Sequence, residues 1–138
     1  MEINFTVLGK PCGKGRPRFM RNGHTYTDAK TENYENLVKL SYQEKFQEMT
    51  FERDVPLEIE IKAYFPIPKG ISKKKRPLYE NETILFSKKP DWDNIGKIIC
   101  DSLNNIAYYD DNQIAKAFVI KLYGKTPRVE ITIRTLEE

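Results

Sequence analysis

The sequence contains little cysteine or histidine, which disfavours several kinds of catalytic and metal site. Its only cysteines are Cys12 and Cys100, which form no Cys-x-x-Cys motif, and its only histidine is His24. This pattern favours reduced thiols over a disulfide or zinc site, and a single histidine cannot by itself form a multi-histidine metal site or a Ser-His-Asp triad. We expect Cys100 to lie in the core and His24 in a loop.

Long apolar runs and internal repeats are also missing. No run of about 18 apolar residues is present, so the sequence predicts no membrane span and no membrane partner. The N-terminal residues MEINFTVLGK alternate like a strand and lack the pattern of a signal peptide, so we expect a cytoplasmic protein. A hydrophobic content of 39% in 138 residues predicts a single globular domain over residues 1–138.

Two segments of the chain carry no acidic residue. Five basic residues lie between Lys10 and His24, and five more between Lys69 and Arg76, although the net charge is only +3. Such segments suit a polyanionic partner, because Lys and Arg neutralise phosphates. The predicted DNA-backbone contacts are Lys14, Arg16, Arg18, Lys73, Lys74, Lys75 and Arg76.

Hydrophobic periodicity divides the first half of the chain into three elements. Residues 2–8 alternate as a strand, and a loop follows that folds back as a short hairpin through HTYT. The segment TDAKTENYENLVKLSYQEKFQEM has helical spacing, with Thr27 or Asp28 as its cap. Its expected apolar side is broad and includes Leu37 and Leu40. PLEIEIKAYFPIP alternates again, as a half-exposed strand.

The second half contains a long irregular segment, a helix and two strands. Residues 66–90 hold four prolines and form a long basic loop, in which Ser72 caps one short turn. A helix of about 11 residues follows, with Asp93 as its N-cap and a left-handed turn at Asn104 and Asn105. QIAKAFVIKLY and RVEITIRTL are expected to pair antiparallel. The predicted fold is an α+β two-layer sandwich, with a mixed or antiparallel sheet of about four strands and two main helices on one face.

Acidic residues gather around the predicted helix. Asp91 and Asp93 precede or begin it in KPDWDNIGK, and Asp110 and Asp111 follow it in YYDDNQI. Carboxylates that converge repel one another unless a cation neutralises them, and oxygen ligands suit Mg²⁺ or Mn²⁺. A helix of this length spans about 16 Å, so a loop or a second chain must bring Asp111 to Asp91. Lys97, one turn after Asp93, could face a phosphate, and Asp101 could orient Lys97.

Each of these features has a simpler explanation when taken alone. Asp93 could be only a helix cap. The row of Asp93, Lys97 and Asp101 could be a ladder of solvated ion pairs along the helix, and Asp110 and Asp111 could simply form a turn. The protein would then be a non-catalytic DNA-binding or interaction module. The combination of two aspartate pairs, a lysine and basic loops favours a metal-dependent phosphodiesterase.

The stretch KPDWDNIGKIICDSL, followed by YYDDNQI, closely resembles the signature of RusA-type Holliday-junction resolvases. These are small nucleases that prophages and phages often carry. GKGRPRF, followed by TYTDAKTENYE, is similar to the N-terminal pattern of Gram-positive and phage members. The D-x-D-N-x-x-K core with a downstream D-D is fairly specific in so short a chain. Two departures, a longer 66–90 segment and a bulky Trp92, bear on junction preference more than on chemistry.

The resemblance implies roles for individual residues. The metal ligands and catalytic carboxylates would be Asp91, Asp93 and Asp111, with Lys97 as the essential lysine and Asn94, Asp101 and Asp110 in supporting positions. The family implies a homodimer with one site per subunit, which nicks two opposed strands of a four-way junction in DNA recombination and repair. The implied cofactor is Mg²⁺, for which Mn²⁺ could substitute. Other branched DNA, such as flaps or forks, is the alternative substrate.

Replacing Lys73, Lys74, Lys75 and Arg76 together by Ala should flatten the salt dependence of DNA binding. Each phosphate that these side chains no longer neutralise should reduce the log–log slope of affinity against salt by about 0.9 on B-DNA. Fluorescence anisotropy at several salt concentrations measures the slope. An unchanged slope would remove the 66–90 loop from the interface.

Overall fold

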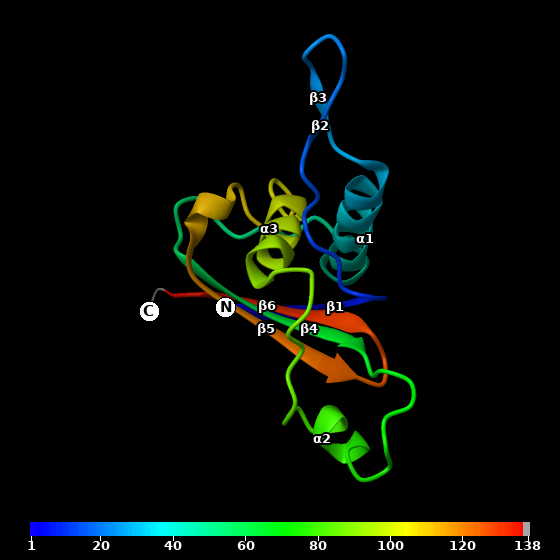
Figure 1. Cartoon of the computed structure of the whole chain (residues 1–138). Coiled ribbons are helices and arrows are strands. Elements are labelled where there is room, and N and C mark those ends of the chain that lie inside the picture. The colour runs from blue at the N-terminus through cyan, green and yellow to red at the C-terminus, as the bar shows by residue number, and fades with distance from the viewer. Residues whose placement is uncertain (137–138) are drawn as a thin grey trace.

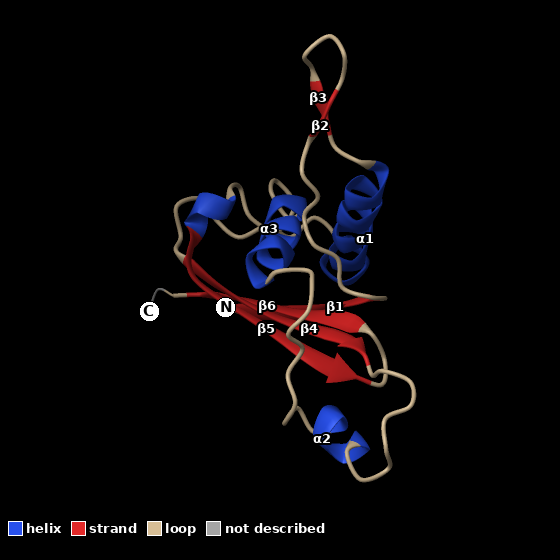
Figure 2. Ribbon diagram, viewed as in Figure 1, coloured by secondary structure: helices blue, strands red, loops and turns tan. Residues whose placement is uncertain are grey.

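The computed structural model describes residues 1–136 and has two layers, a four-stranded sheet with two main helices on one face (Figure 1). The predicted α+β sandwich is therefore confirmed. The elements of the main body are β1 (Glu2–Leu8), α1 (Ala29–Phe46), β4 (Leu57–Pro66), α2 (Arg76–Glu80), α3 (Trp92–Ser102), β5 (Ile114–Gly124) and β6 (Arg128–Thr135). The predicted short hairpin is present as β2 (Arg18–Phe19) and β3 (Thr25–Tyr26), and it stands apart from the main body (Figure 2).

The strand order in the sheet is β1-β6-β4-β5. β6 pairs antiparallel with β1 and β4, and β4 pairs parallel with β5, so the sheet is mixed. The prediction that β5 and β6 pair with each other is wrong, because β4 lies between them. Strands two places apart are separated by about 10 Å. Residues 125–127 can span that distance at about 3.3–3.6 Å per residue, so the short connection crosses the end of β4.

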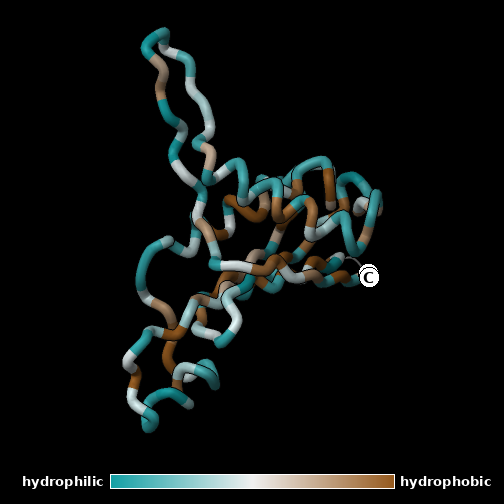
Figure 3. The backbone as a smooth tube through the Cα atoms, turned by 90° about the vertical axis from the view of Figure 1, so that its right-hand side faces the viewer, coloured by the Kyte–Doolittle hydropathy of each residue, from teal (hydrophilic) through white to brown (hydrophobic). Residues whose placement is uncertain are grey.

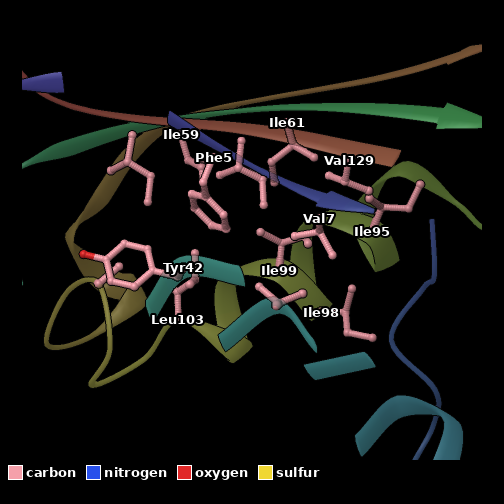
Figure 4. Close-up of a cluster of buried hydrophobic side chains, with 14 of the residues drawn as sticks. Phe5, Val7, Tyr42, Ile59, Ile61, Ile95, Ile98, Ile99, Leu103 and Val129 are labelled. Carbon is pink, nitrogen blue, oxygen red and sulfur yellow. The ribbon is translucent and has the colours of Figure 1, made fainter. Parts of the chain in front are cut away.

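Alternation along the strands creates the core. Ile3, Phe5 and Val7 of β1 are buried, and so are Ile59 and Ile61 of β4. These side chains point from the sheet toward the helices, where they meet the isoleucines of α3 (Figure 4). The strand positions predicted from period-two spacing are therefore confirmed.

The first helix is capped as predicted but buries a narrower face. The Asp28 carboxylate accepts a hydrogen bond from the Thr31 amide at 2.8 Å, which satisfies one of the free N–H groups at the helix start. Tyr34, Val38 and Tyr42 are buried. Leu37 and Leu40 are 39% and 54% exposed, so the broad apolar side expected from the sequence is wrong.

α3 packs its isoleucines on the sheet and begins two residues earlier than predicted. Its N-cap is Asp91, whose side chain makes no capping hydrogen bond, and Asp93 lies in the first turn. The predicted cap at Asp93 is therefore wrong, because the chain is already helical at Trp92. Asn105 adopts a left-handed φ of 63° after the helix, as predicted. Cys100 is partly buried and packs against the core, and His24 lies in the hairpin loop.

The predicted long loop over residues 66–90 is largely irregular but anchored at its end. It contains the short helix α2, which lies on the opposite side of the sheet from α1 and α3 (Figure 1). The Ser72 carbonyl accepts hydrogen bonds from the amides of Lys75 and Arg76, in the turn before α2. The Phe86 amide donates to the Lys121 carbonyl of β5 at 3.1 Å, and the Phe86 ring stacks on Phe65. These contacts attach the segment before α3 to the sheet edge.

The buried apolar residues form the core between the layers, and strongly hydrophobic residues recur along the packed strands and helices (Figure 3). The face of the sheet away from the helices is partly polar. There Arg134 of β6 forms ion pairs with Glu2, Glu58 and Glu60 on the neighbouring strands. No helix within residues 1–136 is long and apolar enough to cross a membrane.

Replacing Ile99 by Ala should lower the free energy of unfolding by about 2–5 kcal/mol, because the side chain is fully buried. Leu40→Ala is the matched control, since Leu40 is 54% exposed and its truncation should change stability by less than about 0.5 kcal/mol. Urea denaturation followed by circular dichroism measures both. Equal effects of the two substitutions would contradict the packing of α3.

Candidate functional site

Asp91 and Asp93, here called the aspartate pair, lie together at the start of α3. Asp91 has an extended backbone (φ −66°, ψ 150°) and Asp93 is helical. Both side chains are exposed, and the Asp93 carboxylate accepts a hydrogen bond from the Asn94 amide at 3.0 Å. The N-terminal end of a helix carries partial positive charge, which stabilises carboxylates there. The roles predicted for Asp91, Asp93 and Asn94 stay predictions.

Lys121 of β5 fixes the chain immediately before the aspartate pair. Its ammonium donates hydrogen bonds to the carbonyls of Lys88 and Pro90, at 2.6 and 2.9 Å. This residue was not predicted from the sequence. In the sheet register Lys121 lies beside the buried Ala63 of β4, on a face of β5 where an apolar side chain is usual. A lysine at such a position is the signal that could have drawn attention to this residue.

Asp110 and Asp111, here called the turn aspartates, lie beyond the other end of α3. The Asp111 amide donates to Asn104 Oδ1 at 2.8 Å, and the Asp110 carboxylate caps the short 3₁₀ turn over Asp111–Gln113. The buried Gln113 side chain donates to the carbonyls of Glu52 and Val55. Asn104 and Gln113 thus hold the turn in place, and neither was predicted as a positioning residue.

Acidic neighbours and burial shape the electrostatics of the turn aspartates. Partial burial raises the pKa of Asp111 above its ordinary value, and the adjacent Asp110 and more distant Asp101 add to this shift. The hydrogen bond from the Asn104 side chain opposes it. A carboxylate that is desolvated and surrounded by other carboxylates is a strong candidate for binding a cation or a proton.

The two aspartate groups do not converge within one chain. α3 has 11 residues and is about 16 Å long, and the groups lie at its opposite ends. Residues 1–136 contain no group of three His, Cys, Asp or Glu side chains that could hold a metal ion. One copy of the chain therefore does not fit a three-carboxylate metal site. The assignment of Asp91, Asp93 and Asp111 to one ion stays a prediction, and it requires a second copy of the chain or a rearrangement of this one.

Lys97 and Asp101 lie on successive turns of α3 after Asp93. Lys97 is exposed. Asp101 forms its ion pair with Lys14, at 3.2 Å, so the hypothesis that Asp101 orients Lys97 has no support in this conformation. Lys14 also binds Glu35 of α1 at 2.7 Å. The Lys14 ammonium, predicted to contact DNA, therefore links the two helices.

An open groove of about 1140 Å³ runs from Asp91 along the loop that follows β1. Its cationic lining residues are Lys10, Lys14, Arg16, Lys30 and Lys89, and its acidic ones are Asp28 and Asp91. Positive charge thus predominates in a groove that reaches the predicted catalytic residue Asp91. Such a surface attracts a phosphate backbone.

Two glycines let this loop approach the helices. The Lys14 amide donates to the Asn94 carbonyl at 2.9 Å, and the Gly15 amide to Thr31 Oγ1 at 3.0 Å. A Cβ at Gly13 would lie 2.7 Å from Pro90 Cβ, and one at Gly15 would meet the Asp28 carboxylate. Glycine is required at both positions because the backbone itself forms the contact.

The remaining predicted DNA contacts lie on two separate surfaces. Arg16 and Arg18 are exposed near the β2–β3 hairpin, and Lys73, Lys74, Lys75 and Arg76 are exposed at α2. Figure 1 shows the hairpin and α2 at opposite ends of the molecule. Arg76 also pairs with Glu80 within α2.

A sequence model of the family described as endodeoxyribonuclease RusA matches residues 9–134. This match includes both aspartate groups, Lys97 and the cationic groove. The chain belongs to the RusA endodeoxyribonuclease family. It is therefore a nuclease, and the RusA family implies an endonuclease that resolves Holliday junctions. RusA nucleases generally depend on a divalent metal and act on branched DNA.

One curated relative is similar to this chain over nearly its whole length. The protein is 38% identical over 137 residues to "Uncharacterized protein YqaN" of Bacillus subtilis (strain 168). The aligned region covers 96% of this chain and 95% of the relative. The two chains thus correspond over nearly their whole lengths.

Replacing Lys14 by Met should lower the free energy of unfolding by about 1–3 kcal/mol, because Glu35 and Asp101 would lose a partly buried cation. Arg16→Met, at an exposed position two residues later in the same groove, should leave stability within about 0.5 kcal/mol of the wild type. Thermal and urea denaturation measure the difference. If both variants are equally stable, the ion pairs at Lys14 do not hold the loop.

Proposed function

We propose that this RusA protein is a Mg²⁺-dependent endonuclease that resolves four-way DNA junctions by paired nicks, with Mn²⁺ as a possible substitute. The observation that carries the proposal is the cation-lined groove that ends at Asp91, in a chain that the RusA model matches from residue 9 to 134. The groove binds the DNA backbone in a manner independent of sequence, since phosphate contacts carry no base information.

The residues of α3 divide the work at the cleavage site. Asp91 and Asp93 present carboxylate oxygens at the exposed helix start, the ligand type that Mg²⁺ prefers. Lys97, one turn further, offsets charge on the phosphate, and the backbone N–H of Asn94 donates a hydrogen bond to the Asp93 carboxylate. A bound divalent ion supplies activation of water and neutralisation of the phosphate.

The third carboxylate comes from a second copy of the chain in this proposal. The aspartate pair and Asp111 lie at opposite ends of α3, so one chain cannot bring them together without rearranging. A symmetric dimer that sets the end of one α3 against the start of the other joins Asp111 of one copy to the aspartate pair of its neighbour. Such a dimer has two sites, as paired nicks require.

Asp93→Asn should reduce junction nicking by at least about a hundred-fold, since even residues that only support metal ligands change metal affinity or activity by about 10–100-fold. Binding of the junction should survive, because the substitution removes charge but little surface. Gel assays of nicking with Mg²⁺ and anisotropy without it separate the two effects. Normal nicking by Asp93→Asn would show that Asp93 is not a metal ligand.

Mixing two inactive variants tests the shared site. Asp93→Asn and Asp111→Asn chains, unfolded together and refolded, should recover nicking with about a quarter of sites intact if subunits pair at random. Asp93→Asn mixed with Asp91→Asn is the matched control and should stay inactive, because both changes fall on the same half-site. If the chains form mixed dimers but neither mixture recovers nicking, all three ligands belong to one chain.

A panel of labelled substrates identifies the branched DNA that is cut. We expect symmetric nicks in a four-way junction, and weaker cutting of flaps and forks of the same arm sequences. Preferential cutting of flaps or forks would identify a nuclease for other branched DNA. Binding without Mg²⁺-dependent cutting of any substrate would contradict the proposal.

A further inference from the structure

The β2–β3 hairpin projects from the body of the protein in both views of the chain (Figures 1 and 3). Arg18 pairs with Tyr26 and Phe19 with Thr25. The loop is closed by hydrogen bonds from the Met20 amide to the His24 carbonyl, at 2.7 Å, and from the Gly23 amide to the Met20 carbonyl. Gly23 adopts the left-handed φ of 85° that such a turn requires.

Large apolar side chains lie exposed on this hairpin. Phe19 is 78% exposed, the highest value of any large hydrophobic residue within residues 1–136. Met20 and Tyr26 are 50% and 49% exposed. A two-stranded ribbon has no core of its own and is marginally stable in water. A group of exposed apolar residues on such an element marks an interaction site more often than an isolated exposed residue does.

The charge of the hairpin favours a polyanion as its partner. Arg16, Arg18 and Arg21 lie in a stretch, residues 11–27, that contains no Asp or Glu. A second hollow, lined by Arg18 and Lys30 at the base of the hairpin, shares Asp28 and Lys30 with the large groove that reaches Asp91. The cationic surface therefore continues from Asp91 to the hairpin. A second hairpin of the same charge would be repelled.

We propose that the β2–β3 hairpin is a DNA-binding arm that places Phe19 against an unstacked base at the branch point. Arg18 and Arg21 contact the flanking phosphates, and the Phe19 ring stacks on the base. The inference rests on the proposed function, because a branch point exposes base faces that the interior of a continuous duplex keeps stacked. Apolar side chains that enter between bases, flanked by cations, are an established way to hold distorted DNA.

The experiment uses Phe19→Ala, Phe19→Trp and the control Phe118→Ala, which truncates a 51% exposed phenylalanine on β5. Dissociation constants are measured without Mg²⁺ for a four-way junction and for a linear duplex of the same arm sequence. A 2-aminopurine at the branch point reports unstacking of that base by its fluorescence. Sedimentation of each free variant reports its oligomeric state.

Phe19→Ala should bind the junction about ten-fold more weakly than the wild type, with duplex binding unaltered. The change in 2-aminopurine fluorescence that the wild type causes on binding should be lost. Phe19→Trp should restore both signals, because a larger ring stacks equally well. Phe118→Ala should behave as the wild type. Nicking by Phe19→Ala should fall only as far as its binding does.

Two outcomes overturn the inference and leave the proposed function intact. One is wild-type junction binding and 2-aminopurine fluorescence in Phe19→Ala. The other is a change of oligomeric state in Phe19→Ala, which would make the hairpin a contact between copies of the chain. A wild-type protein that neither prefers nor nicks the junction would instead refute the proposed function itself.

Discussion

The burial of one isoleucine face of α3 against the sheet determines where the candidate catalytic side chains lie. Ile95, Ile98 and Ile99 are fully buried, which fixes the rotation of the helix about its axis. Asp93 and Lys97 consequently point away from the core. The same helix, being rigid, also fixes the separation of the aspartate pair from the turn aspartates. Packing thus decides both the orientation and the spacing of the acidic groups.

Electrostatic compensation operates at both ends of this helix in different ways. The start of α3 offers free N–H groups and the cations of the groove, so exposed carboxylates are tolerated there. Near its end, Asp101 is neutralised by Lys14, whereas the turn aspartates rely on amide hydrogen bonds from Asn104 and Asn112. Partial burial and the adjacent Asp110 raise the pKa of Asp111, and the hydrogen bond from Asn104 opposes this shift. Such a group gains from a cation more than a fully compensated one does.

Much of the fold follows from the sequence, because strand alternation and helical spacing are local properties. The strands β1 and β4, the cap at Asp28 and the left-handed Asn105 are examples. Strand pairing is not local: β5 and β6 alternate well and are joined by a short segment, yet β4 lies between them in the sheet. The same limit applies to the site. Motif spacing predicted Asp91, Asp93 and Asp111 as metal ligands, and this stays a prediction. The partners of Lys14 and Lys121 depend on which segments the sheet brings together, so they could not be predicted.

The pairing of β1 with β6 has a consequence for how the protein is made. Glu2 lies opposite Arg134, and the Thr135 amide reaches back to the Met1 carbonyl at 2.9 Å. Contacts between such distant positions slow folding, since the intervening chain must first be ordered. While β6 is still inside the ribosome, β1 has no strand beside it. The sheet therefore closes only after β6 has left the ribosome, and until then the backbone edge of β1 that pairs with β6 stays unpaired.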